Sequence, residues 1–217
     1  MSTAEASIIR SREYQLLSDV TLDGVILDVG GGRKSDYHQL IKGSHTFFVI
    51  NLDPNSDPDV FVDIEKPFPL ETEKYDHAIC LNVMEHIFEF DHVFREQLRC
   101  VKKGGNLIFA TPMVYHIHGS PDDYLRYTAS SYRRLAEKYN CEIVQLTPIG
   151  TGLCSLIFQT IEGGIPRGLL RRFGKSLAVK SDFVLNKISK KYRVMTERVP
   201  LGYFVILKKS AVIEPNF

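Results

Sequence analysis

The chain has 217 residues, which is enough for one α/β domain but hardly for two full hydrophobic cores. Apolar residues make up 44% of it and charged residues 24%, so a wholly disordered chain is excluded. The net charge of +1 provides no global field that would attract nucleic acid, and no nucleic-acid partner is expected. No run is apolar enough for a signal peptide or a membrane span, and the four cysteines form no CxxC pair, which predicts a cytoplasmic protein with reduced thiols.

Seven apolar runs are expected to form strands. The run at 45–53 is continuously apolar, which is typical of a strand buried on both faces of a parallel sheet. Helical periodicity fills most of the connections, so the predicted class is α/β with a mostly parallel sheet covered on both faces. In chain order, the runs cover 25–29, 45–53, 59–63, 77–82, 106–112, 141–148 and 203–209.

Apolar periodicity and capping residues predict the helices. Residues 6–20 have an amphipathic pattern, and the glycines that end the first strand should lead into another helix, as in a βαβ unit. Asp91 is the expected N-cap of a helix with Phe94 and Leu98 on its apolar face, and Thr128 is the expected N-cap of the next one. The whole chain, 1–217, is expected to form a single domain.

The sharpest local signal is a glycine triplet at 30–32, preceded by Asp28 at the end of the first strand. Glycines let the backbone turn tightly and approach a ligand. Asp53 follows at the end of the second strand, where an acid typically binds both hydroxyls of a ribose. A dinucleotide site shares these features, but its pattern has a third glycine where this chain has Ser35, and Asp28 disfavours a nearby phosphate.

The order of five motifs carries more information than any one of them. VILDVGGG, NLDP, DVFVDIEKPFP, YDHAICLNVMEHI and VKKGGNLIFATP follow one another in this order. This succession resembles the class I S-adenosylmethionine (SAM)-dependent methyltransferases, in particular the methyltransferase-domain group with an "fD…vleHi…LkpGG" pattern. The resemblance runs from about Val25 to about Thr147 and resumes at the final strand. It implies a Rossmann-like fold with a seven-stranded, mostly parallel sheet and an antiparallel last strand, with SAM as cofactor and S-adenosylhomocysteine as product.

The resemblance also implies a set of SAM contacts. The glycine turn would lie beneath the methionine part of SAM, acids after the second and third strands would meet the ribose and the adenine, and a backbone carbonyl after the fourth would accept from the methionine ammonium. Many family members have a further glycine where this chain has Lys34. The residues implied are Asp28, Gly30, Gly31 and Gly32 for the turn, Asp53 for the ribose, Leu52, Asp63 and Ile64 for the adenine, and Asn82 for the ammonium.

The acceptor of the methyl group is expected near the segment 111–128, which follows the fifth strand and resembles the family's segment at this place. A hydroxyl acceptor must lose a proton, and histidine is suited to removing it near neutral pH. His116 and His118 are therefore the candidate catalytic residues, although hydrogen bonding or packing would explain them as well. Asp122 or Asp123 could complete a metal site only by coincidence, so no metal is expected. Glu85 and His86 are assigned no chemistry.

Residues 151–198 form an insertion between the sixth and seventh strands, with ten Lys and Arg residues against three Asp and Glu residues. Bulky apolar residues at helical spacing alternate with these bases, which predicts basic amphipathic helices. Such helices bind membrane surfaces or anionic ligands. A lid or a dimer interface over the acceptor pocket is an equally good interpretation.

The predicted function is transfer of the SAM methyl group to a small-molecule, glycan or lipid-linked acceptor, in the cytoplasm or at the membrane surface. One alternative is a degenerate SAM-fold module that binds without turnover. The other is an NAD-dependent oxidoreductase, which fits the glycine turn and Asp53 but not Asp28.

Overall fold

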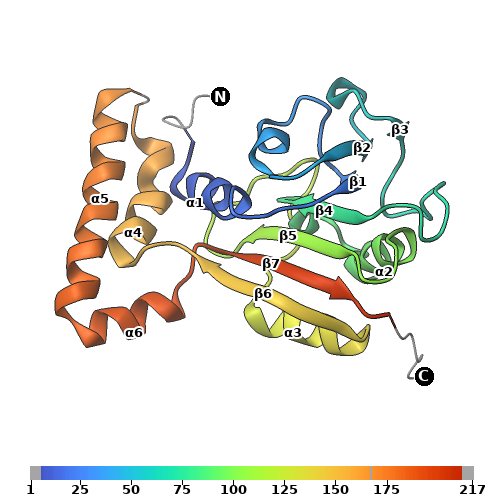
Figure 1. Cartoon of the computed structure of the whole chain (residues 1–217). Helices are drawn as coiled ribbons and strands as arrows, with labels where there is room; N and C mark the ends of the chain where they lie inside the picture. The colour runs from blue at the N-terminus through green and yellow to red at the C-terminus, as the bar shows by residue number, and fades with distance from the viewer. Residues whose placement is uncertain (1–5, 167, 212–217) are drawn as a thin grey trace.

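The computed structural model describes residues 6–166 and 168–211, so the other residues of the predicted domain, 1–5, 167 and 212–217, lie outside it. A seven-stranded sheet forms the centre (Figure 1), in the order β3-β2-β1-β4-β5-β7-β6. The first five strands pair in parallel, and β7 runs antiparallel to both of its neighbours. The predicted sheet is therefore confirmed. Its strands are β1 (Gly24–Val29), β2 (His45–Asn51), β3 (Val60–Phe61), β4 (His77–Leu81), β5 (Asn106–Pro112), β6 (Cys141–Ile149) and β7 (Gly202–Lys209).

Helices cover both faces of the sheet, because alternate side chains of each strand point to opposite faces. In β1, Leu27 and Val29 join the core under α2 and α3, whereas Ile26 joins the core under α1. The second core also takes in Phe158 of α4 and Ala178 of α5. The helices are α1 (Ile8–Leu17), α2 (Phe90–Cys100), α3 (Ala129–Lys138), α4 (Leu153–Ile161), α5 (Leu169–Ile188) and α6 (Lys190–Arg198).

Two local predictions are wrong. The glycines after β1 lead into a short 3-10 turn, η1 (Asp36–Leu40), and not into an α-helix, because the side chains of this turn are bonded back to Asp28. Asp91 lies in the first turn of α2, after the N-cap Glu89, because its carboxylate accepts hydrogen bonds from Lys138 and Tyr139 at 2.7 Å each. The predicted N-cap of α3 is confirmed, since the Thr128 side chain accepts from the backbone N–H of Ser131.

The carboxyl ends of β1, β4 and β5 lie along one edge of the sheet. The insertion leaves and re-enters the sheet at the same edge, because Ile149 at the end of β6 and Pro112 at the end of β5 both pair with Gly202 at the start of β7. The insertion helices are thus placed beside the loops that bind ligands in open α/β sheets.

The insertion consists of α4, α5 and α6, which form a helical layer beside α1 (Figure 1). A buried carboxylate joins these three helices. Asp182 of α5 accepts hydrogen bonds from the backbone N–H groups of Cys154 and Ser155 at 2.9 Å, from the Thr151 hydroxyl at 2.8 Å and from the hydroxyl of Tyr192 in α6. Of the helices in the described part of the chain, none is both long enough and apolar enough to cross a membrane.

Candidate functional site

A cavity of about 760 Å³ lies at the carboxyl edge of the sheet. Its volume falls within the usual range for small-molecule and cofactor sites. The glycine turn, Gly30, Gly31 and Gly32, lines one side of it. The other sides come from the start of α1, from Tyr115 in the loop after β5, and from the first two turns of α5.

The glycine turn presents bare main chain to the cavity because side chains cannot fit there. Gly30 has a φ of +79°, which favours glycine. A Cβ at Gly31 would lie 2.2 Å from the Asp28 carboxylate and from the Tyr37 hydroxyl. The Asn51 side-chain amide donates to the carbonyls of Gly30 and Gly31 at 2.9 and 2.7 Å, which fixes the turn from the neighbouring strand.

Asp28 lies completely buried beneath this turn. Its carboxylate accepts hydrogen bonds from the Tyr37 hydroxyl at 2.8 and 2.9 Å and from His38 Nε2 at 2.7 Å. Burial raises the pKa of Asp28, and the hydrogen bonds from His38 and Tyr37 offset this effect only in part. Asp28 therefore organises the turn from below and is not among the residues that line the cavity.

The acids predicted for the ribose and the adenine both follow strands and cap short turns. Asp53 is exposed at the end of β2, and its Oδ1 accepts from the backbone and side-chain amides of Asn55 at 2.9 Å. Its Oδ2 makes no hydrogen bond within the described residues, so this atom can accept from a ligand. Asp63 accepts from the backbone N–H of Glu65 at 3.0 Å.

The remaining predicted SAM contacts, like Asp53 and Asp63, are not among the residues that line the cavity. Leu52 is exposed next to Asp53, whereas the side chain of Ile64 is buried in the core. Asn82 has a φ of +53°, and its side-chain amide donates to both carboxylate oxygens of Glu13 in α1, at 3.0 and 3.1 Å. This contact joins the end of β4 to α1. The direct contact of each of these residues with SAM stays a prediction.

The two histidines predicted for catalysis lie outside the cavity. His116 is exposed and stacks on Tyr115, with 4.2 Å between ring centroids. Nε2 of His118 lies 3.9 Å from Oε1 of Glu85, and the ring of His118 lies 4.8 Å from the ring of Tyr115. Burial lowers the pKa of His118, which favours the neutral imidazole. Tyr115 is the residue of this loop that reaches the cavity.

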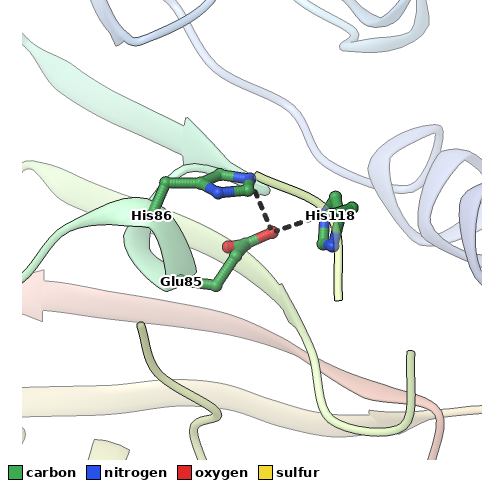
Figure 2. A group of neighbouring side chains, drawn as sticks. All are labelled: Glu85, His86 and His118. Carbon is green, nitrogen blue, oxygen red and sulfur yellow. Dashed lines mark ion pairs between the residues drawn. The ribbon is translucent and has the colours of Figure 1, made fainter. Parts of the chain in front are cut away.

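Figure 2 shows a cluster that brings His118 together with Glu85 and His86. Glu85 and His86 belong to the 3-10 turn η3 (Met84–His86) after β4. The Nε2 atoms of both histidines lie 3.9 Å from Oε1 of Glu85. Glu85 is completely buried, and neither of its carboxylate oxygens has a hydrogen-bond partner among the described residues. Burial accordingly raises the pKa of Glu85 from 4.5 to about 7.

The sequence gives a weak signal for this cluster. Glu85 and His86 are adjacent and follow a buried strand directly, at the edge where ligands bind. The third member, His118, lies after the next strand of the sheet, and only the parallel pairing of β4 with β5 brings it to the pair.

Comparison with known proteins identifies the family. The chain matches a family model described as a methyltransferase domain over residues 7–146. Its fold is similar to that of the cyclase SpnF, with a TM-score of 0.62 and 18% identity over 96% of this chain and 85% of that one. No curated protein matches the chain in sequence.

Several methyltransferases are among the other similar structures. One is an S-adenosylmethionine-dependent methyltransferase from Mesorhizobium loti, with a TM-score of 0.58 and 11% identity over 95% of this chain and 100% of that one. Another is the geranyl diphosphate C-methyltransferase from Streptomyces coelicolor A3(2), with a TM-score of 0.56 and 12% identity over 94% and 81%. The chain belongs to the methyltransferase-domain family, with the Rossmann-like class I fold of SAM-dependent methyltransferases.

The buried carboxylate of Glu85 predicts a pH-dependent stability. In the unfolded chain this group ionises near pH 4.5, but in the folded protein only near 7. Stability is therefore lost as the pH rises through this window, by up to about 3 kcal/mol. Glu85→Gln removes this loss, so the variant should gain stability relative to the wild type between about pH 5 and about pH 8.

Urea unfolding of chelator-treated protein at several pH values measures this difference. A difference in unfolding free energy that does not change with pH would contradict the assignment.

Proposed function

We propose that the protein is a SAM-dependent methyltransferase that methylates a small, negatively charged acceptor. The cavity carries this proposal, because the bare main chain of the glycine turn lines one side of it and the basic side chains of the insertion line another. The family assignment favours methyl transfer over the oxidoreductase and supports SAM as the cofactor. The cyclase SpnF has a similar fold, so the fold by itself does not establish methyl transfer. Cofactor binding and label transfer therefore need separate measurements.

In this proposal, SAM lies with its methionine part over Gly30, Gly31 and Gly32. Oδ2 of Asp53 accepts from the ribose hydroxyls, Leu52 lies beside the adenine, and Asp63 with the backbone of Ile64 meets its amine. Asn82 offers its carbonyl to the methionine ammonium, and its side chain is held by Glu13. Carbonyl oxygens and carboxylates suit the positively charged sulfonium and ammonium groups of SAM better than they would suit the pyrophosphate of a dinucleotide such as NAD.

Binding of S-adenosylhomocysteine tests the cofactor. We expect the product to stabilise the protein in a thermal-shift assay, and NAD to have no effect. Asp53→Asn should weaken the binding of S-adenosylhomocysteine at least tenfold in calorimetry, because an amide replaces the carboxylate that accepts hydrogen bonds from both ribose hydroxyls.

Asp57→Asn is the matched control, since Asp57 is an exposed acid of the same loop that pairs with Arg33 at 3.1 Å. Equal affinities for the two variants would remove Asp53 from the site. Stabilisation by NAD in place of S-adenosylhomocysteine would favour the oxidoreductase.

The charge on the cavity wall indicates an anionic acceptor. Arg10, Arg171, Arg172 and Lys175 line the cavity, against Glu162 and Asp36 as its acids. Arg10 pairs with Glu13 at 3.3 Å, and Arg171 pairs with Glu162 at 3.3 Å. Arg172 is exposed and forms no ion pair with any described residue. Its guanidinium is therefore available for a phosphate or a carboxylate, which it can bind through two hydrogen bonds.

A similar structure supports this choice of acceptor. The C-methyltransferase from Streptomyces coelicolor A3(2) was solved with geranyl diphosphate, an isoprenoid that carries a diphosphate. An acceptor of this kind combines an anionic group for Arg172 with an apolar part for the exposed face of α5. Phosphorylated small molecules, sugar phosphates and lipid-linked phosphates all fall within the proposed class.

Label transfer tests the acceptor. Methyl-labelled SAM is incubated with a panel of phosphorylated, carboxylated and neutral small molecules, glycans and isoprenoid phosphates. We expect label on an anionic member, and at least tenfold lower transfer by Arg172→Gln because the anion loses its charged partner. Lys190→Gln, which removes an exposed base of α6 outside the cavity, should act as the wild type. Equal transfer by both variants, or labelling of neutral acceptors alone, would contradict the proposal.

Lipid-linked acceptors require access to a membrane surface, and α5 supplies a suitable face. Leu169, Leu170, Phe173 and Leu177 of this helix are between 55% and 83% exposed. Arg172 lies between Leu170 and Phe173, and Lys180 follows Leu177 by three residues on the same helix. Apolar side chains together with bases on one helix are typical of elements that lie on anionic membranes, so we include peripheral membrane contact through 151–198 in the proposal.

Vesicle co-sedimentation tests this contact. The protein should sediment with vesicles that contain phosphatidylserine, and less so at high salt. Phe173→Glu should reduce the bound fraction severalfold, because it places a charge in the apolar face. Phe88→Glu changes a similarly exposed phenylalanine elsewhere (63% against 68%) and should have little effect. Absence of binding at low salt would leave α5 as a lid or an interface between subunits.

The proton of a hydroxyl acceptor would pass to His116 or His118, the candidates of the loop after β5. His116 is exposed and lies next to Tyr115, so a modest movement of the loop would bring it to the cavity. A module that binds SAM without turnover would show the product binding described above and no label transfer.

A further inference from the structure

The cluster of Glu85, His86 and His118 contains a buried carboxylate whose hydrogen-bonding capacity the described part of the chain leaves unused. It brings a carboxylate and two imidazole nitrogens together inside the protein, and the carboxylate has no hydrogen-bond donor among the described residues. An unpaired buried carboxylate is costly, and proteins satisfy such groups with donors or with cations.

The hydrogen bond on the far side of His86 decides which of its nitrogens faces Glu85. Nδ1 of His86 lies 2.6 Å from the backbone carbonyl of Asp122. A carbonyl only accepts, so Nδ1 carries the proton, and Nε2 of the neutral ring has a free lone pair. This lone pair is on the nitrogen that lies 3.9 Å from Oε1 of Glu85.

His118 is held in the same way by a different set of acceptors. Its Nδ1 lies 3.2 Å from the carbonyl of His116 and 3.3 Å from Oδ2 of Asp123. Asp123 is itself fixed by Arg126, which donates to the same oxygen at 2.8 Å. Nε2 of His118 is therefore also an acceptor directed at Glu85, 3.9 Å from Oε1.

Three acceptors thus converge on one point, and each histidine donates its other ring N–H to an oxygen behind it. Histidine ligands of metal ions have this arrangement, because the outer hydrogen bond sets the tautomer and orients the ring. Ligand atoms about 2.1 Å from a common ion lie about 3.4 Å apart at the tetrahedral angle. The two observed separations between a histidine nitrogen and Glu85 are 3.9 Å, about 0.5 Å longer than this, and all three ligand atoms lie within 4.8 Å of one another.

We propose that Glu85, His86 and His118 bind a divalent transition-metal ion. Two imidazoles and one carboxylate suit Zn²⁺, Fe²⁺, Co²⁺ or Mn²⁺ better than Mg²⁺ or Ca²⁺, which prefer oxygen ligands. Three protein ligands leave coordination positions open, as in sites where the ion binds a substrate or a water molecule.

The ion would lie next to the acceptor side of the cavity. The rings of His118 and Tyr115 lie 4.8 Å apart, and Tyr115 lines the cavity. An acceptor hydroxyl at an open coordination position would lose its proton more easily, and the ion would hold it in place. With the ion bound, both ring nitrogens of His118 are engaged, so the proton of the acceptor would pass to His116. This role of the ion, unlike the binding of the ion itself, rests on the proposed methyl transfer.

Titration of chelator-treated protein with Zn²⁺, by calorimetry, tests the site. The wild type should bind one Zn²⁺ per chain, and elemental analysis after dialysis should give the same ratio. Glu85→Gln and His118→Gln each remove one ligand and should weaken binding at least tenfold. Asp123→Asn keeps all three ligands but weakens the support of His118, and should cost about tenfold in affinity.

His45→Gln is the matched control. His45 is a partly buried histidine at the N-terminal end of β2, away from the carboxyl edge of the sheet, so the substitution should leave Zn²⁺ binding unchanged. Failure of the wild type to bind, or equal affinity in all variants, would overturn the proposal and would indicate protonated histidines that donate to Glu85. S-adenosylhomocysteine binding, measured on each protein, reports folding and separates this outcome from failure of the proposed function.

Discussion

The buried carboxylate of Asp28 is the constraint on which the rest of the site depends. It lies at the end of a central strand, where burial would normally exclude an acid, and Tyr37 and His38 satisfy it from the segment that follows the glycine turn. These bonds draw the segment back under the turn, so that it forms a 3-10 turn in place of a helix. The main chain of the glycine turn thereby lines the cavity.

The topology of the sheet brings all other parts of the site to this turn. Parallel strands end at one edge, so the residues after β1, β2, β4 and β5 become neighbours although they are far apart in the sequence. The antiparallel hairpin of β6 and β7 returns the insertion to the same edge. One helical layer can therefore supply both a basic wall for the cavity and an exposed apolar face, and Asp182 holds its helices in register.

The sequence predicts the strands and the cap of α3 well, because buried strands and capping residues are local patterns. The antiparallel direction of the last strand follows from the resemblance to the methyltransferases. The sequence cannot show that Asp91 is drawn to Lys138 and Tyr139, or that Tyr37 and His38 fold back onto Asp28, since these contacts depend on tertiary packing. For the same reason the sequence does not reveal the environment of Glu85. Its lack of hydrogen-bond donors, and its encounter with His118, arise only when β4 and β5 pair.

A crystal structure of the protein with S-adenosylhomocysteine tests the central claim most directly. The account predicts density for the amino-acid part of the ligand along Gly30, Gly31 and Gly32, with the ribose hydroxyls on the free oxygen of Asp53 and the sulfur facing the side of the cavity that Arg172 and Tyr115 line. Density for the ligand elsewhere, or a glycine turn that closes over Asp28 and excludes it, would contradict the account.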